Sequence, residues 1–440
     1  MTGKVKIIGG GFAGCEAAWQ LAERGIETEL YEMKPVKFSP AHSSEGLCEL
    51  VCSNSFKAMR ISSAAGMMKE EMRMLSSLCL KCADECSVPA GGALAVDREK
   101  YSALVTEKIL SHKNITVIRE EVREIPDGNV IVAAGPLASE ALSESIKEIC
   151  GGSLSFFDAA APIVTAESID MSRAFTQSRY DRGEPDDYIN CPLSKEEYEA
   201  FYDALINAES AEVHSFDKRK DVYEGCMPVE VMASRGRDTI RYGPMKPAGL
   251  TDPSTGRRPY ANLQLRKENR EGTMYNLVGF QTNLKFAEQK RVFSMIPALR
   301  EAEFVRYGVM HRNTFINSPG ILNPGFSVIK RPSLFFAGQI TGVEGYMESA
   351  ASGILAGINM ARKLKGLDMF VPPETTITGA LARYVADTSV KNFQPMGAAF
   401  GLLPPLGTRI RDKQQRYEKT ALRGLEDLKT QLSDDYFFIK

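Results

Sequence analysis

Lys4-Val-Lys-Ile-Ile8 runs directly into Gly9-Gly-Gly-Phe-Ala-Gly14 near the start of this 440-residue sequence. The apolar run predicts a buried strand, and the residues after the last glycine predict a helix. In such a unit the first glycine permits a tight turn, the second lets a pyrophosphate approach the backbone, and the third lets the helix pack on the strand. The pattern predicts a dinucleotide-binding turn, whose candidate cofactor contacts are Gly9, Gly10, Gly11, Phe12, Ala13 and Gly14.

A second predicted strand at residues 28–31 ends at Glu32, eighteen residues after Gly14. An acidic residue at about this distance accepts hydrogen bonds from the hydroxyls of the adenosine ribose in dinucleotide-binding units. A glycine motif alone is weak evidence, so strand, helix and acid together support the prediction. We therefore expect Glu32 to contact the cofactor.

A second pattern of strand, glycine-rich turn and helix occurs late in the chain. An apolar strand at residues 333–337 leads into a glycine-rich turn and a helix of small residues at 347–363. Backbone amides at the start of such a helix can reach the pyrophosphate of FAD. A dinucleotide domain for NAD alone does not need this late unit, whereas FAD-binding folds of the glutathione-reductase type commonly contain one. The candidate cofactor contacts outside the first turn are Glu32, Gly135, Gly338, Gln339, Gly345 and Tyr346.

Composition indicates an ordinary globular protein of two or three domains. Hydrophobic residues make up 43% and charged residues 25% of the sequence, which excludes a disordered or fibrous chain. The first strand begins so early that we expect no signal peptide, and no apolar run is long enough to predict a membrane span. We therefore expect a cytoplasmic protein whose nine cysteines are thiols rather than disulfides.

Charge is segregated along the chain. Residues 214–312 contain 18 Lys plus Arg against 11 Asp plus Glu, although the formal net charge of the whole chain is −2. Basic residues interleaved with tyrosines suit a nucleic-acid backbone and its bases, whereas a solvated basic face is the alternative. Twelve of these 18 basic residues lie among Tyr223, Tyr242, Tyr260 and Tyr275, namely Lys218, Arg219, Lys220, Arg235, Arg237, Arg241, Lys246, Arg257, Arg258, Arg266, Lys267 and Arg270.

Three cysteines share one side of a segment predicted to be a single helix over residues 66–86. Cys79, Cys82 and Cys86 could belong to an iron–sulfur or zinc site, but no fourth ligand is in register. Small thiols are among the most buried side chains in proteins. We favour a core role for these cysteines and expect no metal.

Eight stretches carry a resemblance to a known family: Gly9–Ala18, Glu49–Ser55, Pro89–Arg98, Glu224–Glu230, Gly243–Pro247, Val309–Thr314, Ala337–Tyr346 and Phe393–Met396. They resemble the folate- and FAD-dependent tRNA (uracil-5-)-methyltransferases, relatives of the larger GidA-type wobble-uridine enzymes. The resemblance covers nearly the whole chain, without the long helical C-terminal domain of the GidA type. Two features depart from it: Gly397 and Ala399 stand where family members carry Asn, and the set of Cys79, Cys82 and Cys86 is unusual.

The sequence patterns and the resemblance imply an α/β fold. We expect an FAD-binding Rossmann-like domain of the glutathione-reductase type with an inserted α+β domain. Residues 1–185 and 326–440 are expected to form the FAD-binding domain, and residues 186–325 the insertion, which would bind RNA.

The resemblance also implies the chemistry. A thiolate that adds to C6 of uracil turns C5 into a nucleophile, and the family's nucleophile corresponds to Cys226, with Cys52 as the second catalytic cysteine. The one-carbon unit would come from methylenetetrahydrofolate through reduced FAD, with NAD(P)H as the source of reducing equivalents. His311 and Arg98 are candidate substrate contacts, although His311 could equally be a structural loop residue. The expected partners are tRNA and folate, and a second copy of the chain in a homodimer is a further candidate.

Several alternatives stay open on the sequence alone. The same chemistry on ribosomal RNA would use the same residues, and a GidA-like wobble-uridine modification is related. A flavin-dependent disulfide reductase is disfavoured because no Cys-x-x-Cys pair follows the first dinucleotide unit. A non-catalytic RNA-binding flavoprotein would tolerate replacement of either cysteine.

Overall fold

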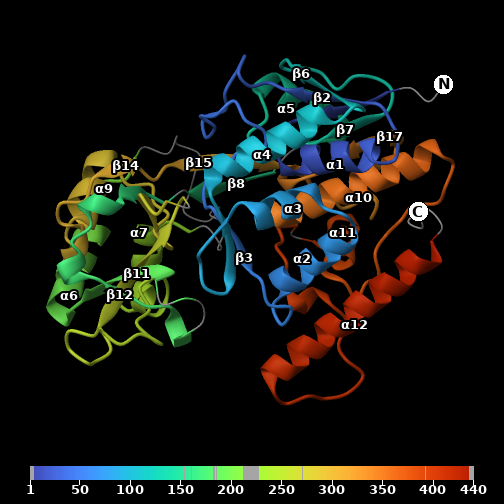
Figure 1. The fold of residues 1–440 in the computed structure, drawn as a ribbon. Coiled ribbons are helices and arrows are strands. Elements are labelled where there is room, and N and C mark those ends of the chain that lie inside the picture. The colour runs from blue at the N-terminus through green and yellow to red at the C-terminus, as the bar shows by residue number, and fades with distance from the viewer. Residues whose placement is uncertain are drawn as a thin grey trace.

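The computed structural model describes residues 4–152, 154–159, 161–181, 184, 186–211, 227–269, 271–391 and 393–435, without the side chains of 154–159, 181, 311 and 312. Figure 1 shows two bodies side by side, each built around its own sheet. The first body contains both ends of the chain, and the second is formed by the middle of the chain. Antiparallel strands β8 (Leu154–Ala159) and β15 (Met310–Phe315) lie where the chain passes between them.

The first sheet has the strand order β16-β17-β7-β1-β2-β6. Its strands are β16 (Ser327–Val328), β17 (Arg331–Phe336), β7 (Val130–Val132), β1 (Val5–Ile8), β2 (Thr28–Glu32) and β6 (Ile115–Arg119). All neighbours are parallel except β16 and β17. The central strands are buried on both faces, which explains their unbroken apolar runs. The carboxyl ends of the parallel strands meet at one edge, the usual place for a ligand in such a sheet.

Helices α1 (Phe12–Ala22) and α10 (Tyr346–Leu364) pack against each other beside this sheet (Figure 1). A Cβ added to Gly353 would come within 2.2 Å of the carbonyl oxygen of Ala13. One added to Gly357 would come within 2.8 Å of the carbonyl oxygen of Ala17. Because the contacts advance in the same direction along both helices, the helices run parallel and begin at the same edge of the sheet.

Residues 66–86 do not form the single helix that the periodicity predicts. Helix α2 (Ala64–Met74) ends before Ser76, which has a left-handed φ of 60°, and α3 (Leu78–Glu85) starts afresh. The Ser77 side chain caps α3 by accepting a hydrogen bond from the amide of Leu80. Serines that bond to nearby backbone break a helix even where the apolar spacing continues across them.

The second sheet is antiparallel, with the order β10-β11-β12-β13-β9-β14. Its strands are β10 (Phe175–Thr176), β11 (Tyr188–Leu193), β12 (Ala261–Lys267), β13 (Met274–Leu277), β9 (Ile163–Thr165) and β14 (Phe304–Arg306). Alternate residues of β11, β12 and β13 pack into a hydrophobic core with α6 (Lys195–Ile206), α7 (Val229–Ala233), α8 (Thr239–Tyr242) and α9 (Phe286–Phe293). Strands β9 and β10 belong to this sheet although they precede residue 186, where the insertion is expected to start.

The remaining elements complete the first body. They are the sheet of β3 (Ser55–Ala58), β5 (Ala93–Val96) and β4 (Ser87–Val88), and the helices α4 (Arg98–Ser111), α5 (Glu140–Cys150), α11 (Ile377–Ala386) and α12 (Lys413–Asp434). The Asp97 side chain caps α4 by accepting a hydrogen bond from the amide of Lys100. Within the part of the chain that the structure describes, no helix combines the length and apolar character needed to span a membrane.

Candidate active site

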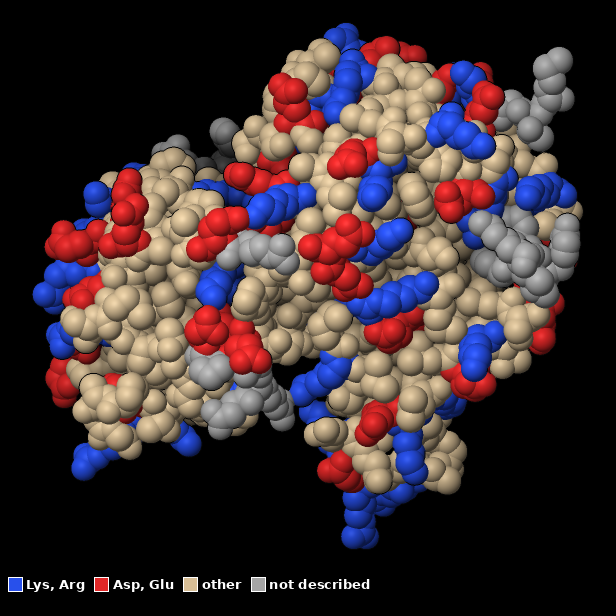
Figure 2. All heavy atoms as spheres, viewed as in Figure 1, with Lys and Arg blue, Asp and Glu red and all other residues tan. Residues whose placement is uncertain are grey.

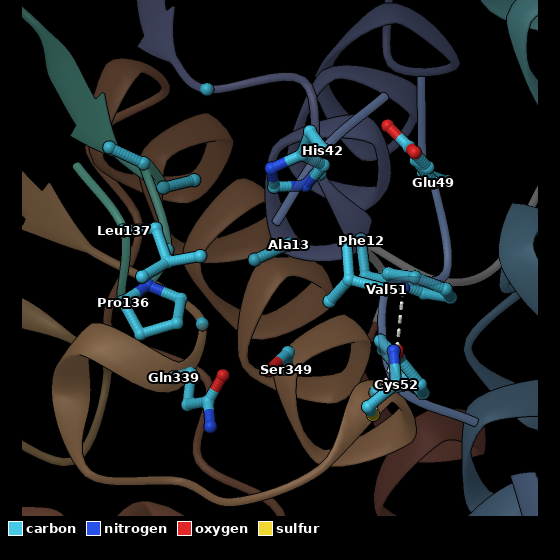
Figure 3. A pocket seen from close by; sticks show the side chains of 18 of the residues that line it. Phe12, Ala13, His42, Glu49, Val51, Cys52, Pro136, Leu137, Gln339 and Ser349 are labelled. Carbon is cyan, nitrogen blue, oxygen red and sulfur yellow. Dashed lines mark hydrogen bonds between the residues drawn. The ribbon is translucent and has the colours of Figure 1, made fainter. Parts of the chain in front are cut away.

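A cavity of about 500 Å³ lies where the carboxyl ends of β1, β2 and β7 meet the starts of α1 and α10. In Figure 3, Val51 and Cys52 lie on one side, and Pro136, Leu137 and Gln339 lie on the other. The cavity is lined by almost all of the predicted cofactor contacts, namely Gly9, Gly10, Gly11, Phe12, Ala13, Glu32, Gly135, Gly338, Gln339, Gly345 and Tyr346. Its opposite wall comes from the second body and includes Arg266, Asn276, Val278 and Gln281.

The three glycines of the first turn have different surroundings. Gly9 has a φ of +106°, and a Cβ there would come within 2.4 Å of the Ala133 carbonyl oxygen. A Cβ on Gly14 would come within 1.8 Å of the Gly9 carbonyl oxygen, so α1 packs directly on the turn. A Cβ on Gly11 meets no atom of the described residues within 4 Å. The turn is therefore tight on its protein side and open toward the cavity.

The start of α1 suits a phosphate. Its N-cap residue, Gly11, has no side chain to cap the helix, so the first amides of α1 receive no side-chain cap. Unsatisfied amides and the positive end of the helix dipole both attract an anion. This end of α1 lies in the cavity lining.

Glu32 sits at the end of β2 and is only 7% exposed. One carboxylate oxygen accepts a hydrogen bond from the Gly10 amide at 2.8 Å, and the other accepts from the Lys34 amide at 2.9 Å. The carboxylate thus holds the glycine turn in place. Each oxygen can still accept a further hydrogen bond from a ribose hydroxyl, because a carboxylate offers about four acceptor positions.

On the other side of the cavity, α10 starts with a turn that only glycine fits well. Gly338, Gly342 and Gly345 have φ values of +86°, +88° and +122°. The Gly338 amide donates to Ser352 Oγ at 2.7 Å, and Gln339 Nε2 donates to Glu344 at 2.6 Å. These contacts fix a second set of backbone groups against the cavity, opposite the β1–α1 turn.

A buried donor without a partner faces the same cavity. Asn276 on β13 is 3% exposed and lines the cavity wall, and its Nδ2 has no hydrogen-bond partner among the described residues. Leaving such a donor unpaired is costly, whereas a carbonyl oxygen of a bound heterocycle would satisfy it. Together with the open glycine turn and Glu32, this donor provides the contacts that the pyrophosphate, a ribose and a ring carbonyl of a flavin dinucleotide would need.

The candidate catalytic residue Cys52 lies in a loop of residues 50–54, hereafter the Cys52 loop. The amides of Val51 and Cys52 donate to the Tyr346 hydroxyl at 2.9 and 3.0 Å, and Cys52 Sγ lies 3.1 Å from the same oxygen. Cys52 is half-buried and lines the cavity. The start of α10 and this sulfur are therefore parts of one site.

Three other predicted residues lie differently. Arg98 does not line the cavity: its guanidinium pairs with Glu268 at 3.0 Å and donates to the Leu50 carbonyl. His311 is on β15, but its side chain is not among those described. Cys226 lies outside the described residues, as do Lys218, Arg219, Lys220 and Arg270.

Arg266 is wrongly grouped with the basic residues that face solvent. It is 7% exposed, and its guanidinium donates to Asn54 Oδ1 at 3.0 Å and Ser53 Oγ at 2.9 Å. The alternation along β12 carries the signal, because Leu263 and Leu265 enter the core while Arg266 points from the opposite face. That face meets the Cys52 loop.

Sequence reasoning also missed a polar cluster on the cavity wall. Glu49 pairs with Lys34 at 3.2 Å, and His42 Nδ1 lies 2.6 Å from Ser39 Oγ. Burial, and then the charge of Lys34, lower the pKa of His42 below its usual value. His42 and Glu49 are labelled in Figure 3. In the sequence, His42 and Glu49 belong to a run of polar residues without helix or strand periodicity, and this run alone does not indicate a site.

The unusual cysteine set lies in the core. Cys79 and Cys82 are fully buried on α3, and Cys86 comes after it at 9% exposure. Burial raises the pKa of Cys79 to about 12 and that of Cys82 still further. Neither thiol lines the cavity, and buried protonated thiols are poor nucleophiles. This arrangement does not suit the dithiol of a disulfide reductase.

Comparison with solved structures supports this fold. Two crystal forms of GidA from Aquifex aeolicus match with TM-scores of 0.68, at 17% and 18% identity. They cover 98% of this chain and 76% and 78% of the GidA chain. The α/β FAD-binding Rossmann-like class is therefore confirmed.

Comparison with known sequences defines the family. The model for glucose inhibited division protein A matches residues 4–368. A methylenetetrahydrofolate--tRNA-(uracil-5-)-methyltransferase TrmFO from Acetivibrio thermocellus is 60% identical over 98% of this chain and 99% of its own length. The protein of the same name from Halalkalibacterium halodurans is 56% identical over 97% of this chain and 98% of its own length. The chain therefore belongs to the glucose inhibited division protein A family and, within it, to the TrmFO methyltransferases.

Proposed function

We propose that this chain is an FAD-dependent enzyme that uses methylenetetrahydrofolate to methylate C5 of a uridine in tRNA. The observation that carries the proposal is one cavity formed by a dinucleotide turn and the Cys52 loop, in a chain 60% identical along nearly its full length to a relative named for this reaction. The target we propose is the T-loop uridine, with NAD(P)H as reductant.

The cofactor would lie between the two glycine turns. The open face at Gly11 and the first amides of α1 suit its pyrophosphate, and Glu32 suits its ribose. Asn276 would donate to a ring carbonyl. When bound and reduced by NAD(P)H, FAD would carry the one-carbon unit donated by methylenetetrahydrofolate and would supply the electron pair that reduces it from the methylene to the methyl level. The residues of this chain bind and orient these groups and exclude water from the cavity.

The two cysteines would act on the uracil ring. A Cys226 thiolate adds to C6, which makes C5 nucleophilic enough to take the one-carbon unit. Cys52 then accepts the proton from C5, and the bond between C6 and the sulfur breaks as the C5–C6 double bond returns. Both roles rest on the family resemblance and on the place of Cys52 in the cavity wall.

Transfer of labelled carbon tests the function. Purified holoenzyme, methylenetetrahydrofolate labelled at its methylene carbon and NADPH should yield 5-methyluridine in a tRNA transcript, measured by mass spectrometry of nucleosides. A transcript with cytidine in place of the T-loop uridine is the matched control and should stay unlabelled. Label in a ribosomal RNA fragment but not in tRNA would assign the enzyme to the other substrate. A protein that cannot be reconstituted with FAD would reject the proposal.

A fluorinated substrate tests the cysteine roles. RNA with 5-fluorouridine at the target should become covalently attached to Cys226, because fluorine cannot leave C5 as a proton does. Cys226→Ala should lose both adduct and methylation but keep FAD. Cys52→Ala should lose turnover and still form the adduct. A peptide adduct at Cys52 would exchange the two roles, and full activity of both variants would exclude thiolate catalysis.

The domain division is also a proposal. Strands β8 and β15 lie side by side where the chain crosses between the two sheets, and β9 and β10 already pair within the second sheet. We place the division at β8 and β15, with the second body as the RNA-facing insertion. Limited proteolysis should cut first near these strands.

We also expect a homodimer. Size-exclusion chromatography with light scattering tests this expectation.

A further inference from the structure

The Cys52 loop is held by arginines from three separate elements. Arg98 at the start of α4 donates to the Leu50 carbonyl, and Arg306 on β14 donates to the Val51 carbonyl. Arg266 on β12 donates to Ser53 and Asn54. Two of these arginines belong to the second body, so the geometry around Cys52 depends on how that body sits against the first.

The hydrogen bonds of Tyr346 determine the direction of its contact with the sulfur. A phenol oxygen has one proton to donate and limited acceptor capacity. Tyr346 already accepts from the amides of Val51 and Cys52 at 2.9 and 3.0 Å. Its own proton is therefore free to point at Cys52 Sγ, 3.1 Å away. The sulfur is then the acceptor of this hydrogen bond, which favours a thiolate over a thiol.

The charged groups around the Cys52 loop leave an excess of positive charge, because Arg98, Arg266 and Arg306 share Glu268 as the nearby carboxylate. Arg98, Arg306, Glu268 and the Tyr346 hydroxyl interact with one another there, and the first two and Tyr346 also interact with Cys52. Glu268 pairs with Arg98 at 3.0 Å. No carboxylate of the described residues lies within 4.0 Å of the Arg306 guanidinium.

Burial adds to the effect of this excess of positive charge. Burial lowers the pKa of Arg306 below its usual value, and the charge of Arg98 lowers it further. Burial also raises the pKa of Tyr346 well above its usual value, so that its proton stays on the hydroxyl. Arg306 is half-buried, and a cation withdrawn from water without a carboxylate partner is costly; an anionic sulfur beside it would supply the missing negative charge.

We propose that Arg306 and Arg98 are positioning residues that keep Cys52 as a thiolate, with the Tyr346 hydroxyl as its hydrogen-bond donor. The charge of the sulfur follows from these contacts alone, whereas its use as the base that accepts the C5 proton rests on the proposed function. Arg306 comes from the second body, so correct seating of that body would set the basicity of a residue in the first.

The pH dependence of alkylation tests this proposal. Holoenzyme is treated with iodoacetamide from pH 5 to 10, and modification of the Cys52 peptide is measured by mass spectrometry. The wild-type rate should titrate with an apparent pKa below about 8.5, the ordinary value of a cysteine. Arg306→Gln should raise this pKa by at least about one unit, which lowers the rate about tenfold at pH values well below both pKa values, and Arg306→Lys should restore most of it. Arg300→Gln, an exposed arginine of the same body, is the matched control and should change nothing.

The outcomes separate the proposal from the proposed function. A wild-type pKa of 8.5 or above, or an Arg306→Gln profile equal to wild type, overturns it. Flavin absorbance and thermal unfolding show whether Arg306→Gln is folded, and if it is not, the wild-type and Arg306→Lys profiles decide. A low pKa that depends on Arg306, in a protein that fails to methylate tRNA, supports the thiolate and rejects only the methyltransferase function.

Discussion

At the scale of single residues, glycines of one turn have different roles. Gly14 lies against the Gly9 carbonyl, where a Cβ would approach to 1.8 Å, so it is needed for the fold itself. Gly11 has open space on its Cβ side and a φ of −80°, which any residue can adopt. Its lack of a side chain is therefore explained by a ligand that approaches the backbone.

Replacing these two glycines should separate binding from folding. Gly11→Ala should keep the thermal stability of the apoprotein but lose FAD, because its methyl group projects toward the cavity. Gly14→Ala should lower stability by about 1–3 kcal/mol or more, since the added Cβ overlaps a backbone oxygen. Flavin absorbance after purification and urea unfolding of the apoprotein measure the two effects. Retention of FAD by Gly11→Ala at wild-type affinity would contradict the proposed phosphate position.

At the scale of elements, two buried carboxyl groups cap helices that belong to other segments. Glu16 on α1 accepts from the amides of Leu78 and Cys79 at 3.2 and 2.9 Å, at the start of α3. Glu71 on α2 accepts from the amides of Ile377 and Thr378, both at 2.8 Å, at the start of α11. These contacts satisfy amides that a helix leaves unpaired and tie together helices far apart in the sequence.

The two carboxyl groups should make stability depend on pH. Burial raises the pKa of Glu16 and of Glu71 from 4.5 to about 7. Each carboxyl group therefore binds its proton more tightly in the folded chain than in the unfolded chain. The free energy of unfolding should fall by roughly 3 kcal/mol for each group as pH rises from about 4.5 to 7. Above that range it should level off. Glu16→Gln/Glu71→Gln should weaken this dependence, measured by urea unfolding at pH 5.5 and 8 with saturating FAD.

A matched variant controls for the general titration of surface carboxylates. Glu107→Gln removes one exposed carboxyl group of α4 and should leave the pH dependence as in the wild type. If the double variant also keeps the wild-type difference between pH 5.5 and 8, the buried carboxyl groups do not control it.

At the scale of the whole molecule, exposed basic residues lie on both bodies. Arg257 and Arg258 are exposed on the second body. In Figure 2, Lys and Arg side chains also gather at the protruding lower end of the molecule, where α12 begins in Figure 1. The exposed basic residues of that region include Arg409, Arg411 and Lys413. By contrast, Arg237 and Arg241 pair with Asp203 and Asp238.

RNA affinity should therefore depend steeply on salt. Each phosphate contact that a basic residue makes contributes about −0.9 to −0.7 to the slope of log affinity against log salt. Arg257→Gln/Arg258→Gln and Arg409→Gln/Arg411→Gln should each weaken tRNA binding and flatten that slope by about one to two, measured by fluorescence anisotropy. The control is Lys113→Gln/Lys147→Gln, which removes the same charge from exposed residues just after α4 and within α5. Equal slopes for all proteins would leave the basic residues as a solvated surface.

Features set by consecutive residues were predictable from the sequence. The β1–α1 turn, the acid at the end of β2 and the late strand and helix are local patterns, because turn chemistry and strand apolarity depend on neighbours in the chain. Their convergence on one cavity is a consequence of parallel pairing, which the order of the units implies. The family resemblance added the proposed roles of the two cysteines.

Only the tertiary structure decided what surrounds Cys52. Arg306 lies 255 residues from Val51 in the sequence and Arg98 was expected at the substrate, yet both hold the Cys52 loop. Arg266 looks like a surface residue in a basic segment but is buried between the two bodies. The physical reason is that the environment of a charge depends on which surfaces pack together, and residue type and spacing do not encode that packing locally.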